Sequence, residues 1–166
     1  DKLDVLFTTN NGVSVETYDQ VHLAWVDDPA TTLTVIWRTF EITTPSQVEY
    51  RQLGQATWQP ATGAQRSSGT TGTLHEVTLI SLQPSTVYEY RVKGDSDTWS
   101  GVFQARTAPT TNSPGDFEVV YVADTGLIGR VDGLATGTSQ VVDEIMQLNP
   151  LLVLLGGDYA YYNTDK

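Results

Sequence analysis

Two aspartates in the last third of the 166-residue sequence have the setting of a chemically active pair. Asp124 follows the apolar run at residues 117–122, and Asp158 follows the apolar run at 151–155. If the two runs are neighbouring parallel strands, the Cα atoms of the aspartates lie about 5 Å apart at one edge of the sheet. Two carboxylates that close stay ionised only when cations neutralise them. Two metal ions about 3.5 Å apart, bridged by one carboxylate, would do so and would suit phosphoryl transfer.

Glycines flank both aspartates. Gly126 would let the backbone approach a metal, and Gly157 would relieve crowding before Asp158. Either aspartate alone is better explained as a cap on the turn that follows a strand. The two together, each beside glycine, favour a metal site. The run Asp124-Thr125-Gly126 also matches aspartic proteases superficially, but those continue with Ser or Ala and are all-β, whereas Leu127 follows here.

The segment between the two runs predicts a helix. Thr138 or Ser139 can cap it, and residues 140–148 carry apolar side chains at helical spacing. Asn149-Pro150 ends it. The order strand, helix, strand predicts a β-α-β unit with two parallel strands and a right-handed crossover.

Residues 20–109 have a different pattern, which predicts an all-β sandwich. Period-2 alternation places Val21, Leu23 and Trp25 on one side of the first strand. Residues 65–73 are rich in Ser, Gly and Thr and predict a loop. About seven short strands are expected in this region, at 20–26, 33–39, 48–51, 57–58, 75–79, 81–92 and 99–106.

The run Leu82-x-Pro84-x-Thr86-x-Tyr88 resembles the fibronectin type III signature. In that fold the tyrosine plugs a corner of the sandwich and hydrogen-bonds back to the chain. A buried phenol needs a partner, so Tyr88 is expected to bond to a carbonyl of the preceding turn.

Composition argues against several classes of partner. The net charge is −11 and the pI is about 4.3, which disfavours binding to nucleic acids or to anionic membrane surfaces. Residues 110–166 hold eight of the twenty acidic residues and two of the nine basic ones. No cysteine is present, which excludes disulfides and thiolate sites. No apolar run approaches the roughly 18 residues of a transmembrane helix. His22 and His75 lie in predicted strands and are expected to be ordinary, partly exposed histidines.

Two motifs together resemble the purple acid phosphatases of the metallophosphoesterase superfamily. Asp124-Thr125-Gly126 is similar to the Asp-x-Gly motif that opens the metal domain. Gly157-Asp158-x-x-Tyr161 is similar to the Gly-Asp-x-x-Tyr motif of the family. The domain order, and the stretches 20–23, 82–92 and 99–103, also look like the N-terminal domain of that family.

The resemblance implies a dinuclear metal centre that hydrolyses phosphate monoesters with a metal-activated water. Asp124 would bind Fe(III), Asp158 would bridge it to a divalent Zn, Mn or Fe ion, and Tyr161 would bind the iron as phenolate. Oxygen ligands suit such a hard ion. Tyr159 and Tyr162 are expected to be packing or rim residues.

The sequence departs from the family pattern because later motifs of that pattern, Gly-Asn-His-Glu and Gly-His-x-His, do not occur. The remaining ligands and the proton-donor histidine are therefore expected downstream. The expected plan has an N-terminal arm (1–19), a fibronectin-like sandwich (20–109), a linker (110–116) and the start of a catalytic domain (117–166). This piece is expected to be inactive alone and to need the rest of that domain as its partner; whether it holds metal by itself stays open.

Two alternatives keep parts of this interpretation. A non-catalytic fibronectin-like adhesion or binding module would explain residues 20–109 and leave the aspartates idle. A phosphodiesterase or nucleotide hydrolase would keep the fold and change the substrate. The acidic, charge-poor β-module and the family resemblance predict a secreted or periplasmic protein, although no Asn-x-Ser/Thr glycosylation site occurs.

Overall fold

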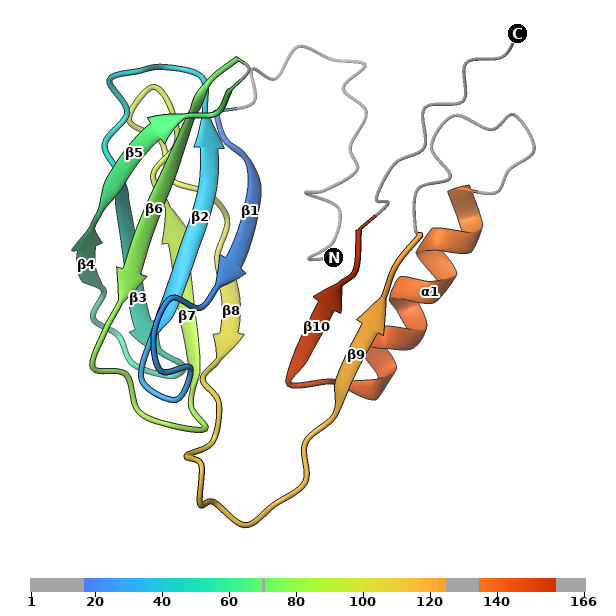
Figure 1. Ribbon diagram of the computed structural model, residues 1–166. Coiled ribbons are helices and arrows are strands. Elements are labelled where there is room, and N and C mark those ends of the chain that lie inside the picture. The colour runs from blue at the N-terminus through green and yellow to red at the C-terminus, as the bar shows by residue number, and fades with distance from the viewer. Residues whose placement is uncertain (1–16, 70, 125–134, 158–166) are drawn as a thin grey trace, which may run out of the picture. The chain divides into compact units, whose positions relative to one another are not determined.

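The computed structural model describes residues 17–69, 71–124 and 135–157 (Figure 1). They divide into two compact units, the first ending at Asn112 and the second beginning at Ser113. Each unit is described by itself.

The first unit is a sandwich of two four-stranded antiparallel sheets, which confirms the all-β prediction for this region (Figure 1). The first sheet has the order β1 (Asp19–Ala24), β2 (Leu33–Thr39), β6 (Thr73–Leu79), β5 (Ala64–Ser67). The second has the order β4 (Gln59–Thr62), β3 (Gln47–Gln52), β7 (Val87–Val92), β8 (Phe103–Arg106).

Alternating side chains of both sheets build one core between them. In β2, Leu33, Val35 and Trp37 are at most 1% exposed. Val77 of β6, next to β2 in the first sheet, and Val92 of β7 in the second sheet belong to the same core, and both are fully buried. Successive residues of a strand point to opposite faces of the sheet. The face that carries the apolar residues at every second position is therefore the one that packs into the core.

Three local predictions are wrong. The expected loop at 65–73 contains strand β5, and the strand expected at 57–58 begins later, as β4 at Gln59. Leu23 and Trp25 are 37% and 38% exposed, although Val21 does pack against the core. The register shifts between Asp19 and His22 in β1, and this irregularity breaks the alternation that the prediction assumed.

Tyr88 closes one corner of the sandwich. Its side chain is buried, and its phenol oxygen accepts a hydrogen bond from the backbone N–H of Gln83 at 2.9 Å. The expected partner was a carbonyl, so the direction of the predicted bond is wrong while its location is confirmed. The carbonyl of Gln83 instead accepts the hydroxyl of Thr107 at 2.6 Å.

We expect Tyr88→Phe to lower the free energy of unfolding by about 1–3 kcal/mol, because the part-buried Gln83 N–H loses its partner. Urea denaturation followed by circular dichroism measures the change. Tyr50→Phe is the matched control, since Tyr50 is less buried. Equal losses for the two variants would contradict a special role for the corner.

His75 is fully buried, so its predicted partial exposure is wrong; His22 is exposed as expected. The ring stacks on Trp37 with centroids 4.9 Å apart. Its Nδ1 lies 2.9 Å from the hydroxyl of Ser46, which itself donates to the carbonyl of Ala64. Nδ1 therefore carries the proton, and Nε2 accepts from the hydroxyl of Thr39 at 2.7 Å. Burial lowers the pKa of His75, opposed in part by the negative charge of Asp95.

We expect this buried neutral histidine to make the sandwich less stable in acid. Below the unfolded-state pKa of about 6.5 the unfolded chain binds a proton that the folded chain refuses. Stability is therefore complete above that pH and falls as the pH drops toward the lowered folded-state pKa. Urea midpoints between neutral and acidic pH measure the slope. His75→Gln should flatten it, His22→Gln should leave it unchanged, and the reverse result would contradict the assignment.

The second unit has the order β9 (Val119–Val122), α1 (Ala135–Leu148), β10 (Leu152–Leu155), with β9 and β10 paired in parallel. Both strands lie within their expected ranges, and the helix covers the expected residues 140–148 but begins earlier, at Ala135. The helix begins before Thr138 and Ser139, so neither residue caps it. Asn149 ends it with a positive φ of 48° and an N–H bond to the carbonyl of Met146. In the described part of the chain, no helix has the length and apolar character needed to cross a membrane.

Candidate metal centre

The carboxyl ends of β9 and β10 lie side by side. Their register pairs Val119 with Leu152 and Val122 with Leu155. Beyond the last pair, the N–H of Gly156 donates to the carbonyl of Val122 at 2.8 Å. Both strands therefore end at the same edge, where sites form in sheets of parallel strands.

Asp124 stands at this edge with its backbone held in place. Its N–H donates to the carbonyl of Gly157 at 3.2 Å. Its φ is 59°, in the left-handed region that aspartate tolerates better than most residues. The chain therefore turns sharply at Asp124, directly across from the residue that precedes Asp158 in the sequence.

The two glycines after β10 have different reasons to be glycine. A Cβ at Gly156 would overlap the phenol ring of Tyr121, so this position is the crowded one. A Cβ at Gly157 would meet no atom of the described residues within 4 Å, but the φ of Gly157 is 102°. The prediction that Gly157 relieves crowding is wrong; its backbone conformation explains the glycine instead.

Of the three predicted metal ligands, the structure describes Asp124; Asp158 and Tyr161 lie outside the described residues, as does Gly126. Among residues 17–69, 71–124 and 135–157, no three His, Cys, Asp or Glu side chains come together as a metal site. The buried, hydrogen-bonded His75 is occupied in the sandwich core and is unsuited to bind a metal there. The three-residue ligand set therefore stays a prediction.

The part of the site that is described fits the expected metals. The parallel pairing brings the backbone of Asp124 within a hydrogen bond of Gly157, which is bonded to Asp158 in the chain. Carboxylate and phenol oxygens are the donors that hard trivalent ions prefer. The carboxylate of Asp124 and its place at the strand end are therefore compatible with the predicted metals, and the roles of Asp158 and Tyr161 stay predictions.

A cluster of paired charges and tryptophans covers the outer face of β3 and β7, and the sequence analysis missed it. Arg51 bonds to Glu89 and Arg91 to Glu49, each with Nε 2.8 Å from a carboxylate oxygen. Two tryptophan rings stack against these cations. The centroid of the Trp58 ring lies 4.3 Å from Cζ of Arg51 and 4.8 Å from Cζ of Arg91. The centroid of the Trp99 ring lies 4.9 Å from Cζ of Arg91 and 4.7 Å from Nζ of Lys93.

The spacing of this cluster was visible in the sequence. Glu49-x-Arg51 and Glu89-x-Arg91 repeat the same pattern on strands whose antiparallel register sets each acid opposite a base. Both guanidinium groups are already paired and stacked, so this face offers little to an anionic ligand.

By its fold, the protein is a two-sheet β-sandwich joined to a parallel strand-helix-strand unit. The family model described as purple acid phosphatase, N-terminal domain, matches residues 18–107. The chain therefore belongs to the purple acid phosphatase family, of which it contains the N-terminal domain.

Curated relatives agree with this membership. The chain is 33% identical over 95 residues to purple acid phosphatase 15 of Arabidopsis thaliana, 31% identical over 97 to purple acid phosphatase 23, and 32% identical over 97 to purple acid phosphatase 13. Each match covers 57% of this chain and, in the same order, 17%, 19% and 16% of the relative. The chain thus spans less than a fifth of the length of these relatives.

Proposed function

We propose that this chain is the N-terminal part of a dinuclear-metal acid phosphatase that hydrolyses phosphate monoesters. The observation that carries the proposal is the acidic strand end: Asp124 pairs with Gly157 at the carboxyl edge of two parallel strands. The family membership of residues 18–107 supports it. No observation favours a phosphodiester or nucleotide substrate over a monoester.

Three residues would hold the metals in this proposal. Asp124 and Tyr161 would bind Fe(III), and Asp158 would bridge to a Zn, Mn or Fe ion. When bound, the ions supply a water of lowered pKa as nucleophile and polarise the phosphoryl group. The chain contributes the strand edge, where the backbone N–H of Asp124 bonds to the carbonyl of Gly157.

Exposed apolar side chains on one face of the β9–β10 sheet support the proposal that this unit belongs to a larger catalytic domain. Tyr121 and Leu154 are register partners and are 68% and 46% exposed, and Val119 on the same face is 43% exposed. Apolar side chains in such a run are stabilised by burial against another layer. The rest of the catalytic domain would cover this face and supply the proton-donor histidine.

The test compares this chain with the longer protein of which we propose it to be a part. The longer protein should hydrolyse p-nitrophenyl phosphate at acid pH and lose that activity when a chelator removes its metals. The 166-residue chain should show no activity above background. Hydrolysis by the chain alone at a rate similar to that of the longer protein would overturn the proposal.

A further inference from the structure

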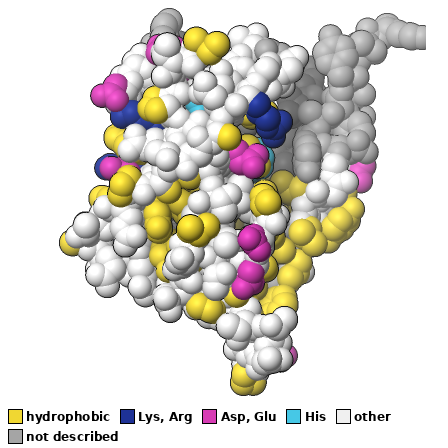
Figure 2. All heavy atoms as spheres, turned by 60° about the vertical axis from the view of Figure 1, so that its left-hand side comes forward, with side chains coloured by type: hydrophobic (Ala, Val, Ile, Leu, Met, Phe, Trp, Pro, Cys, Tyr) yellow, Lys and Arg dark blue, Asp and Glu magenta, His cyan; other side chains and the backbone are white. Residues whose placement is uncertain are grey.

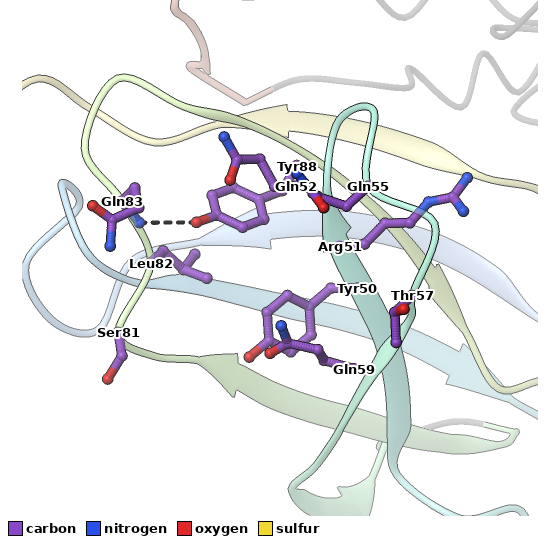
Figure 3. A pocket seen from close by; sticks show the side chains of 10 residues that line it. All are labelled: Tyr50, Arg51, Gln52, Gln55, Thr57, Gln59, Ser81, Leu82, Gln83 and Tyr88. Carbon is purple, nitrogen blue, oxygen red and sulfur yellow. Dashed lines mark hydrogen bonds between the residues drawn. The ribbon is translucent and has the colours of Figure 1, made fainter.

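The sandwich has a pocket at one end whose lining is unusual in composition (Figure 3). Its volume is about 360 Å³, within the range of small-ligand sites. Residues of β3, the β3–β4 turn, the start of β4 and the β6–β7 connection form its walls. Six of its side chains are neutral amides or hydroxyls: Gln52, Gln55, Gln59, Gln83, Thr57 and Ser81.

Two tyrosines line the pocket, of which Tyr50 is half-buried and presents ring surface, while Tyr88 is only 6% exposed. Tyr50 and Tyr88 have ring centroids 6.3 Å apart and planes inclined by 51°. Gln59 is the cross-strand partner of Tyr50, and Gln52 is that of Tyr88, so each ring has an amide beside it. This arrangement places hydrogen-bonding groups around apolar ring faces.

None of the described residues that line the pocket offers a free cation to an anionic ligand. Arg51 belongs to its lining, but the guanidinium extends away from Tyr50 and Leu82 (Figure 3). That group is paired with Glu89 at 2.8 Å and stacked on Trp58 at 4.3 Å. Charged side chains are also sparse and scattered on the face of the sandwich seen in Figure 2. The charge balance therefore favours a neutral ligand.

One wall of the pocket, the β6–β7 connection, is held in place by hydrogen bonds of its backbone. The N–H of Leu82 donates to the carbonyl of Thr31 at 2.9 Å, and the N–H of Gln83 donates to Tyr88. Ser81 has a φ of 58°, which turns the β6–β7 connection at the rim. Pre-organised walls lower the entropy that a ligand must lose on binding.

From these features we infer that the pocket binds a neutral oligosaccharide. A side-chain amide both donates and accepts, which matches the paired hydroxyls of a sugar ring. The exposed part of the Tyr50 ring offers contact to the apolar C–H side of the sugar ring. The site lies wholly within the first unit and does not depend on the proposed phosphatase activity, so each can fail without the other.

The test uses the full chain and nuclear magnetic resonance titration of its amide signals. Cellotriose probes a structural polysaccharide as the source, and mannotriose and chitobiose probe a protein glycan. At least one should shift the signals of the pocket residues saturably, with a Kd of about 1 mM. Gln55→Ala and Gln59→Ala should each raise that Kd about three- to tenfold. Both residues are exposed, so the fold should persist, and the amide spectrum checks this.

Gln104→Ala is the matched control, because Gln104 is an exposed glutamine on β8 and is absent from the pocket lining. It should leave the Kd unchanged within about twofold. Inorganic phosphate should not displace the sugar. The inference is overturned if none of the three sugars gives a saturable shift at about 10 mM, if both pocket variants bind as the unmodified chain does, or if phosphate competes.

Discussion

Asp158→Ala in the intact protein is expected to remove both metal ions and to lower phosphatase activity by at least about 10³-fold, which corresponds to roughly 4 kcal/mol of transition-state stabilisation. The reason is its proposed role as the one carboxylate shared by both ions. Without Asp158 each ion would lose one of its ligands, so neither ion would keep its full ligand set. Metal content by mass spectrometry and kcat with p-nitrophenyl phosphate measure the two effects.

Two further variants separate the bridging role from a general loss of acid charge. Asp143→Ala removes an exposed carboxylate on α1, away from the strand ends, and should keep metal and activity. Tyr161→Phe should keep metal but lose the visible absorption that a phenolate on iron gives. Retention of both metals in Asp158→Ala would contradict the bridge, and retention of colour in Tyr161→Phe would contradict the phenolate assignment.

The strands that could be predicted from sequence are those whose side chains enter the core. Strand β2 coincides with its predicted range because Leu33, Val35 and Trp37 alternate with polar or less buried residues and leave one consistent reading. Strand β5 was missed for the opposite reason. All four residues of this edge strand, Ala64–Ser67, are exposed. Its sequence therefore lacks the alternation of apolar and polar residues that a half-buried strand has.

The same limit applies to buried polar groups. His75 lies on the inward side of β6 with Val77, which the alternation implied. Its burial depends on two hydroxyls, one on Thr39 of β2 and one on Ser46, which directly precedes β3. Pairings over such sequence distances leave no local signal, which is why partial exposure was the wrong expectation.

The candidate site was predictable in part because it depends on strand ends. Two apolar runs followed by Asp124 and Asp158 predicted parallel strands that end together, and the pairing of β9 with β10 has that register. The placement of Asp158 and Tyr161 lies outside the described residues. The pocket could not be predicted, because its glutamines come from separate turns and strands that only the folded sandwich brings together.

Trp37→Ala should have the largest effect on the stability of the sandwich, lowering the free energy of unfolding by about 3–5 kcal/mol. Trp37 is fully buried at the centre of β2, and its indole N–H donates to the carbonyl of Lys93 on the opposite sheet at 2.8 Å. Truncation leaves a cavity, an unpaired carbonyl and an unstacked His75. Since small domains are stable by about 5–15 kcal/mol, a large fraction of that stability would be lost.

Two controls divide this loss into its causes, with urea midpoints followed by circular dichroism because each change alters tryptophan fluorescence. Trp37→Phe keeps an aromatic ring in the core and loses the bond to Lys93. It should therefore lower the free energy of unfolding by less than Trp37→Ala does and by more than Trp25→Ala does. Trp25→Ala removes a tryptophan that is 38% exposed beyond the end of β1, and should cost about 1 kcal/mol or less. Because Trp37 joins the two sheets through one hydrogen bond and stacks on the buried histidine, its removal should also reduce the acid sensitivity attributed to His75. A Trp37→Ala midpoint equal to that of Trp25→Ala would show that β2 does not hold the core together.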